Sequence, residues 1–254
     1  MPGFEDPTTA VTLLLVVITS AAGLVHGALG LGFPMIATPL VAMLTDVRSA
    51  ILIVLAPTLA INVVNILRGG HWTRSIGRFW PLAAYAGVGS VAGSQLLVVS
   101  DPAPYKLLLA AMILLYLNVS RLGLPMGWVR AHPQLASAVF GCLAGFLAGT
   151  VNVMVPVLIV FSLELGLAPV VMIQVFNFCF LSGKLAQAAV LAHAGVLTGP
   201  VITATLPLLA VAVAGLLAGM ALRDRVDPET YRRWLKRVLL AIALMLIAQF
   251  FCGR

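Results

Sequence analysis

Long apolar stretches follow one another along almost the whole chain, and short polar segments separate them. The stretches are continuous and do not alternate between apolar and polar positions, so they predict helices and not strands. Six of the ten stretches are long enough for a membrane crossing, which needs about 20 residues. The apolar stretches cover approximately residues 8–26, 34–44, 48–67, 79–99, 104–122, 134–149, 156–165, 168–191, 198–221 and 230–251. This pattern predicts an all-α integral membrane protein.

Composition agrees with a membrane environment. Of 254 residues, 61% are hydrophobic and 9% are charged, whereas soluble domains carry about 25% charged residues. The mean hydropathy is +1.10. The net charge of +7 comes from basic residues in short loops, where they orient a membrane protein. We therefore expect a lipid bilayer, and no nucleic acid, as a partner.

The sequence also predicts an internal duplication. The other four stretches, which are shorter or interrupted by glycine, form two adjacent pairs, and one pair opens each half of the chain. At a constant offset of 122, the halves align Gly23 with Gly145, Gly27 with Gly149, Pro34 with Pro156, His71 with His193 and Gly93 with Gly215. The proline pair and the histidine pair share the same offset, which favours two repeats, residues 1–125 and 126–254.

The basic residues choose between two topologies. If each short pair is one broken helix that crosses once, the two sides share the basic residues almost equally. If each pair is a re-entrant hairpin, the repeats are inverted, and eleven of the fifteen basic residues fall on one side. The positive-inside rule favours the second arrangement. It predicts six crossings, two re-entrant hairpins, and a multi-pass protein of the cell membrane with both termini outside the cytoplasm. Whether segment 8–26 crosses fully stays open.

The first short pair meets at a cluster of glycines. Gly27, Gly30 and Gly32 precede Phe33 and Pro34, and each glycine would cost a helix about 1 kcal/mol. Proline suits the first turn of a new helix. One helix therefore ends near His26, and another begins near Phe33.

The second short pair repeats this design with fewer glycines. Gly149 and Pro156 enclose Thr150 and Asn152, which supply polar side chains. A broken backbone inside a membrane must face protein or water, and the start of a helix attracts anions. Two such breaks predict a binding site for a small anion near the bilayer midplane. The alternative is that the glycines only permit close helix packing.

Polar residues inside the apolar helices extend this prediction. A stripe on one helix face includes Gln174, Asn177, Lys184 and Gln187, and Asn62 and Asn65 match the last two at the same offset. A charge at membrane depth is expensive and favours a functional role. The alternatives are amides that join helices and a lysine that reaches the interface. The candidate substrate-binding residues are Gly27, Gly30, Gly32, Phe33, Asn62, Asn65, Thr150, Asn152, Asn177, Lys184 and Gln187.

Two further residues are candidates for proton coupling. His26 borders the first break and Glu164 ends the second short stretch. A packed histidine and a solvated carboxylate are the alternatives. The sequence contains no catalytic motif and no cluster of metal-ligating residues. We therefore expect no enzymatic activity, no metal and no cofactor.

The motifs resemble a known family. The first break, with Pro39-Leu40 after it, is similar to the opening signature of the sulfite exporter TauE/SafE family, and the second break occupies the place of its counterpart. The second break departs from the pattern because it has fewer glycines. The resemblance covers nearly the whole chain. It implies a secondary transporter for a small anion, such as sulfite or an organosulfonate, bound between the two broken helices.

Other functions remain open at this point. A passive anion channel would show neither saturation nor counterflow. A non-catalytic membrane assembly subunit would direct its polar stripe at a partner chain. A homo-oligomer is compatible with either reading and with a transporter.

Overall fold

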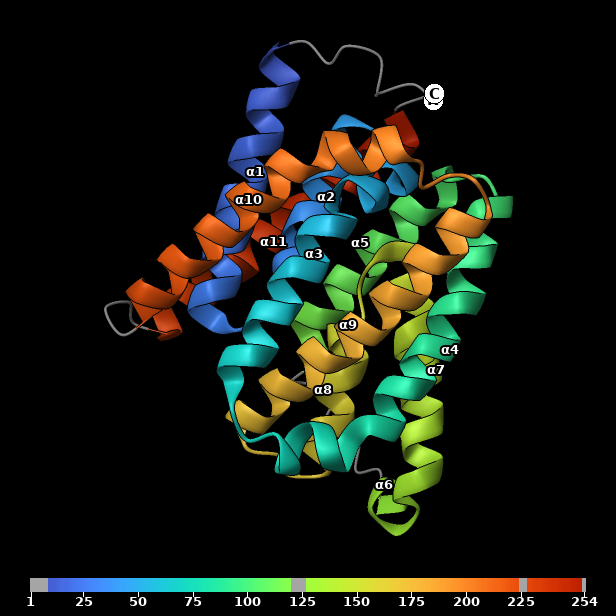
Figure 1. Cartoon of the computed structure of the whole chain (residues 1–254), viewed down its shortest axis with the longest axis vertical. Helices are drawn as coiled ribbons and strands as arrows, with labels where there is room; N and C mark the ends of the chain where they lie inside the picture. The colour runs from blue at the N-terminus through green and yellow to red at the C-terminus, as the bar shows by residue number, and fades with distance from the viewer. Residues whose placement is uncertain (1–8, 120–126, 224–227, 253–254) are drawn as a thin grey trace. The chain divides into compact units, whose positions relative to one another are not determined.

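The computed structural model describes residues 9–119, 127–223 and 228–252, and they contain helices but no strands. This confirms the predicted all-α fold (Figure 1). The predicted boundary between the repeats, at 125/126, lies outside the described residues. The helices are α1 (Thr9–Leu29), α2 (Phe33–Leu44), α3 (Val47–Gly69), α4 (Arg78–Val99), α5 (Ala103–Asn118), α6 (Gly127–Ala131), α7 (Pro133–Val151), α8 (Val155–Glu164), α9 (Pro169–His193), α10 (Gly199–Leu222) and α11 (Pro228–Cys252), with a π-helical turn, η1 (Thr73–Gly77), before α4.

Seven described helical segments are long and apolar enough to cross a membrane. They include α1 and α7, which the sequence assigns to the two hairpins, and they leave out α5, which has 16 described residues. The limbs of each hairpin differ in length. At 1.5 Å per residue, a 21-residue helix such as α1 is about 31 Å long, whereas the 12-residue α2 is about 18 Å long. Re-entry of the hairpins remains a prediction.

The chain forms two compact units, and each takes helices from both halves of the sequence. The first unit comprises residues 1–61, 101–117 and 197–254, and the second comprises residues 62–100 and 118–196. The first therefore holds α1, α2, α5, α10, α11 and most of α3. The second holds α4, α6, α7, α8, α9 and the end of α3.

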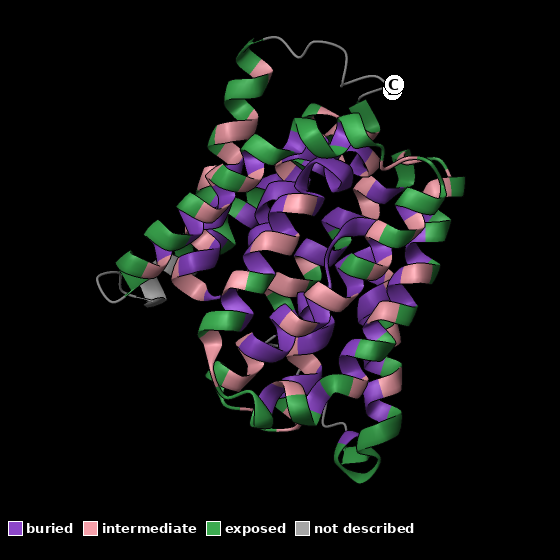
Figure 2. Cartoon of the chain, in the orientation of Figure 1, coloured by how far each residue is buried: buried purple, intermediate pink, exposed green. Residues whose placement is uncertain are grey.

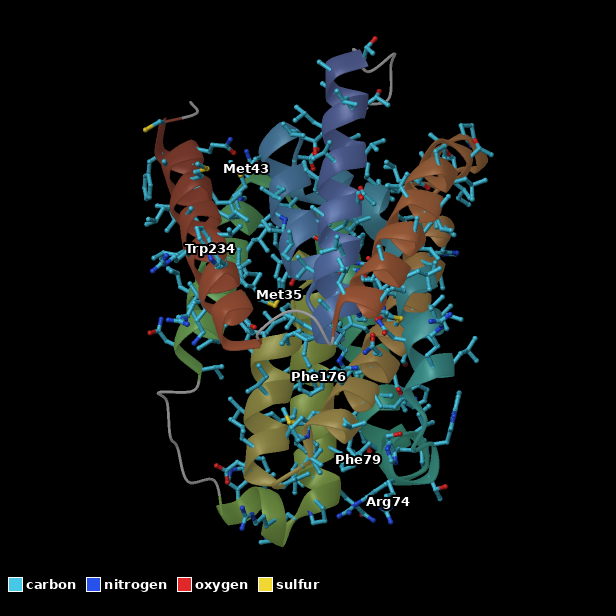
Figure 3. The ribbon with its side chains drawn as sticks, turned by 90° about the vertical axis from the view of Figure 1, so that its left-hand side faces the viewer. Met35, Met43, Arg74, Phe79, Phe176 and Trp234 are labelled. Atoms are coloured by element: carbon cyan, nitrogen blue, oxygen red, sulfur yellow. The ribbon has the colours of Figure 1, made fainter. Side chains whose placement is uncertain are left out.

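Small residues bring α1 and α10 together in the first unit. A Cβ atom on Gly23 would lie 2.4 Å from the Ala212 carbonyl oxygen, and one on Gly27 would lie 2.1 Å from that of Leu216. Such distances are shorter than any van der Waals contact, so only glycine permits this approach. α2 packs beside α1 (Figure 3). The Gln249 amide of α11 donates to the carbonyl oxygen of Met43 at 3.4 Å.

The same packing joins α4 and α7 in the second unit. A Cβ atom on Gly145 would lie 2.0 Å from the Ala86 carbonyl oxygen, and one on Gly149 would lie 2.6 Å from that of Ser90. Both helices therefore run in the same direction. α9 also runs parallel to α4, because the Ser182 hydroxyl donates to the Ala83 carbonyl oxygen and, further along both helices, Val99 of α4 lines the same groove as His193 of α9.

These directions establish a reversal of the chain inside the second unit. Since α7 and α9 both run parallel to α4, the short α8 between them runs back (Figure 1). The second break is therefore the tip of a helical hairpin and not a kink in one straight crossing. The inverted relation between the repeats remains a prediction.

Equivalent contacts define the register of the duplication. Ala86 and Ala212 meet glycines that are 122 residues apart, but they themselves are 126 residues apart. The α4 glycines Gly89 and Gly93 thus correspond to Gly215 and Gly219. The predicted pairing of Gly93 with Gly215 is wrong. The offsets of 122 and 126 residues differ by four residues, which is close to one helical turn. Both offsets therefore place glycine on the same helix face, and the sequence pattern alone does not distinguish them.

The two short helices are largely buried, and α8 contributes to an aromatic cluster. Most residues of α2 and α8 are buried (Figure 2), as expected of helices that are apolar on every face. In the second unit, the Phe161 ring on α8 contacts Phe79 at 6.2 Å and Phe140 at 5.5 Å between centroids. Figure 3 shows Phe79 near the same end of this unit as Arg74.

Candidate functional site

The first break lies between α1 and α2 and is built on left-handed glycines. Gly30 has φ of 78° and Gly32 has φ of 116°, both in a region that favours glycine. The Phe33 amide, at the start of α2, donates to Nδ1 of His26 at 3.1 Å. His26 is buried, and Nδ1 acts as the acceptor. One donor at the start of α2 is therefore satisfied by a side chain of α1.

The second break has the same backbone design with different residues. Asn152 follows α7 with φ of 61°, at the position 122 residues after Gly30. The Gly30 amide donates to the His26 carbonyl oxygen at 2.6 Å, and the Asn152 amide donates to that of Ala148 at 3.1 Å. Asparagine is one of the few residues that adopt the left-handed conformation readily. The thinner glycine pattern of the second half therefore preserves the turn.

The two breaks differ in how they begin the short helix. His26 corresponds to Ala148 at the offset of 122, and an alanine side chain accepts no hydrogen bond. α8 begins at Val155, and Met154 in the N-cap position makes no side-chain capping bond. The start of α8 thus lacks the imidazole acceptor that α2 has.

Lys184 is buried in a polar network at the second break. Only 1% of its surface is exposed, and its ammonium group donates to Oε1 of Gln187. Nε2 of Gln187 donates in turn to the carbonyl oxygen of Gly149 at 2.9 Å, in the last turn of α7. The lysine is therefore linked through one amide to the helix end that precedes the break. Its ammonium group points to a buried partner and not to an interface.

The same helix carries the rest of the polar stripe. Gln174 is buried and its amide donates to the Ile66 carbonyl oxygen of α3 at 2.9 Å. Asn177 is buried as well and donates to the Ile173 carbonyl oxygen at 2.8 Å. Gln174 thus joins α9 to α3. This is the alternative to a binding role that the sequence left open for the amides of the stripe.

The two asparagines of α3 are buried with unused donors. Asn62 is 1% exposed and Asn65 is 7% exposed, and neither Nδ2 atom has a partner among the described residues. A buried donor without a partner costs about 1–3 kcal/mol, so such groups are unusual in a purely structural role. By contrast, the Thr150 hydroxyl donates to carbonyl oxygens of its own helix, at 3.0 Å from Phe146 and 3.3 Å from Leu147.

Two serines of α4, Ser90 and Ser94, belong to the same region but were absent from the predicted site. The Ser90 hydroxyl donates to the carbonyl oxygen of Gly183, the residue before Lys184, at 2.7 Å. Ser94 lies one turn further along, and its backbone nitrogen would be 2.8 Å from a Cβ atom on Gly149. The spacing of four residues on a glycine-rich face was a usable signal, because it places both hydroxyls on one side of the helix.

The remaining candidates belong to the first break or to the end of α8. The first-break residues Gly27, Gly30, Gly32 and Phe33 belong to the first unit, as does His26. Glu164 is half-buried at the end of α8, and its carbonyl oxygen accepts a bond from the Arg130 guanidinium. Among the described residues, no group of three or more His, Cys, Asp or Glu side chains could hold a metal ion.

An open groove of about 370 Å³ lies between α4 and α9. Val91, Gln95, Val190 and His193 are among its lining residues, and the others are all valine or alanine. None of the predicted binding residues lines it. A groove with so few polar groups on a membrane-spanning helix pair lacks the convergent polar contacts of a ligand site.

The fold and the buried network together define a class of protein. Multiple spanning helices, a hairpin of broken helices and an ammonium group buried beside the break are features of polytopic membrane transporters. Comparison with known sequences gives the particular family. The profile of the sulfite exporter TauE/SafE family matches residues 15–246, and the chain belongs to this family.

Family membership fixes the coarse function. The family consists of membrane transporters and not of enzymes. This confirms the prediction of a transporter and the prediction that the protein is not an enzyme. The chain is thus a multi-pass membrane protein whose family transports sulfite or related sulfur anions. No curated protein and no solved structure matches the chain significantly.

Proposed function

We propose that the protein is a secondary transporter that carries a sulfur oxyanion, sulfite or a small organosulfonate, across the cell membrane. The observation that supports this most is the buried Lys184, which is linked through Gln187 to the end of α7. The described residues place no carboxylate in this network. An anionic substrate would supply the opposite charge that a buried ammonium group requires.

The start of α8 adds a second source of positive potential. α8 has ten residues and begins directly after the break. The partial charge at a helix N-terminus is roughly half an elementary charge, and its free amides bind oxyanions. The Met154 side chain ends 3.3 Å from the position of a Cβ atom on Gly183, next to Lys184. The lysine-bearing turn of α9 and the start of α8 are therefore neighbours.

Amide groups supply hydrogen bonds that suit an oxyanion. Asn62 and Asn65 offer unused Nδ2 donors within the second unit, and Asn152 stands at the tip of the hairpin. Sulfite and sulfonates present three oxygen acceptors on a pyramidal or tetrahedral centre. A binding site that combines one cation with several amide donors would suit this shape better than it would suit a halide or a long organic chain.

Flux through purified protein in lipid vesicles tests the function. We expect radiolabelled sulfite uptake to saturate with concentration and to accelerate when unlabelled sulfite is present on the opposite side. Taurine-like and short alkyl sulfonates should compete, whereas chloride at the same concentration should not. Uptake that rises linearly, without acceleration by sulfite on the opposite side, would instead identify a passive channel. Vesicles with no flux above the protein-free control would contradict any transport role for the isolated chain.

A further inference from the structure

Ser94 combines deep burial with an unused hydroxyl group. It is 0% exposed, and its Oγ has no hydrogen-bond partner among the described residues. Burial of a hydroxyl without a partner is unfavourable. Most buried polar groups in proteins are satisfied, and an exception needs an explanation such as a bound ligand.

Its position connects Ser94 to the Lys184 network. The Ser94 backbone lies against Gly149, and the Gly149 carbonyl oxygen accepts the bond from Gln187. Gln187 is the partner of Lys184. Ser94 therefore lies on α4 beside the end of α7, and the end of α7 is linked through Gln187 to Lys184 of α9.

Ser90, one turn earlier on the same face, provides an internal comparison. Its hydroxyl is occupied, because it donates to the Gly183 carbonyl oxygen at 2.7 Å and so joins α4 to α9. Of two serines on one helix face, one has a structural partner and the other has none. Packing between α4 and α9 explains Ser90 but leaves Ser94 unexplained.

The duplicated packing in the first unit shows that a hydroxyl is unnecessary for helix contact. Gly27 meets Leu216 and Met220 with nearly the same backbone geometry with which Gly149 meets Ser90 and Ser94. Leu216 and Met220 are apolar and 126 residues after the two serines. A large apolar residue can therefore occupy the equivalent of position 94 against such a glycine, and the polar side chain occurs only in the unit that holds Lys184.

We propose that Ser94 is a substrate-binding residue whose hydroxyl donates a hydrogen bond to the oxyanion held beside Lys184. This inference rests on the proposed function, since the ligand is the transported anion. A hydroxyl donor contacts an oxyanion with charge-assisted strength. The α4 helix would then contribute to the binding site together with α8 and α9.

Replacement of Ser94 by alanine, with Ser90→Ala as the matched control, tests this assignment. In vesicles, Ser94→Ala should raise the half-saturating sulfite concentration by about tenfold, which corresponds to loss of one charge-assisted bond. Without sulfite, the melting temperature of the purified variant should equal or exceed that of the parent, because an unpaired buried hydroxyl has been removed. Ser94→Cys keeps a side chain of similar shape but with a weaker donor. Its half-saturating sulfite concentration should therefore lie between those of the parent and of Ser94→Ala.

The control separates binding from structure. Ser90→Ala should lower the melting temperature without sulfite, because it removes a bond between helices, and should change half-saturation less. Parent-like half-saturation in Ser94→Ala would overturn the proposal. A melting temperature that falls in Ser94→Ala as it does in Ser90→Ala would assign Ser94 a structural role and overturn it equally. If the parent itself shows no sulfite flux, the proposed function fails first, and the inference fails with it.

Discussion

The left-handed residue at each break is the smallest unit on which the hairpins depend. Gly30 and Asn152 stand 122 residues apart with φ of 78° and 61°. A residue with a Cβ atom other than asparagine or aspartate loses roughly 1–2 kcal/mol in this conformation. The second half therefore keeps its turn while it exchanges a glycine for a buried amide.

Substitutions at Asn152 separate backbone from side-chain effects. Asn152→Gly keeps the left-handed turn, whereas Asn152→Ala adds strain, so we expect the alanine variant to be less stable by about 1 kcal/mol. Thermal unfolding of both purified variants in one detergent measures the difference. Equal melting temperatures would show that residue 152 is not held in the left-handed conformation.

Helical spacing in the sequence predicted the polar stripe of α9 but not its hydrogen-bond partners. The stripe from Gln174 to Gln187 follows from helical spacing, and the structure buries all four of its members. Spacing does not reveal which amide joins helices and which remains available, because this depends on neighbours distant in the chain. Gln174 bonds to Ile66, 108 residues away. Ser90 and Ser94 were missed, although their spacing of four residues places both hydroxyls on one face of α4.

At the scale of helices, glycine contacts hold each unit together. The α4–α7 pair approaches until the backbone of one helix fills the space of a missing side chain in the other. Dispersion contacts over such a close surface stabilise helices in a membrane, where burial of apolar surface provides little driving force.

An added methyl group on α7 tests this packing. Gly145→Ala would place its Cβ atom 2.0 Å from the Ala86 carbonyl oxygen, so the helices must separate, at a cost of about 1–3 kcal/mol. Gly199→Ala is the matched control, because no atom lies within 4 Å of its Cβ position. Unfolding in a denaturing detergent should show a lower midpoint for Gly145→Ala alone. Similar midpoints for both variants would contradict close packing at Gly145.

The arrangement of whole elements was only partly predictable. The hydrophobic pattern gave the helices and the two breaks, because length and glycine content are local properties. It did not show that each compact unit combines helices from both halves, with α1 beside α10 and α4 beside α7. These pairings depend on complementary glycine faces, and a shift of one helical turn changes the face very little.

For the whole molecule, the charge distribution makes a prediction about orientation. The hairpin arrangement collects eleven of fifteen basic residues on one side, and the positive-inside rule places this side in the cytoplasm. Reporter fusions after Arg254 and in the segment around Arg74 should therefore report opposite sides, with the C-terminus outside. A cytoplasmic C-terminus would contradict the inverted arrangement of the repeats.

The central claim is that Lys184 holds the transported anion at the second break. Lys184→Gln removes the charge but keeps a polar side chain. At matched protein level in vesicles, it should raise the half-saturating sulfite concentration about tenfold, equal to about 1.4 kcal/mol. Lys106→Gln is the control, because this half-buried lysine of α5 lies outside the network, and it should behave like the parent. Sulfite transport by Lys184→Gln that cannot be distinguished from that of the parent would contradict the account.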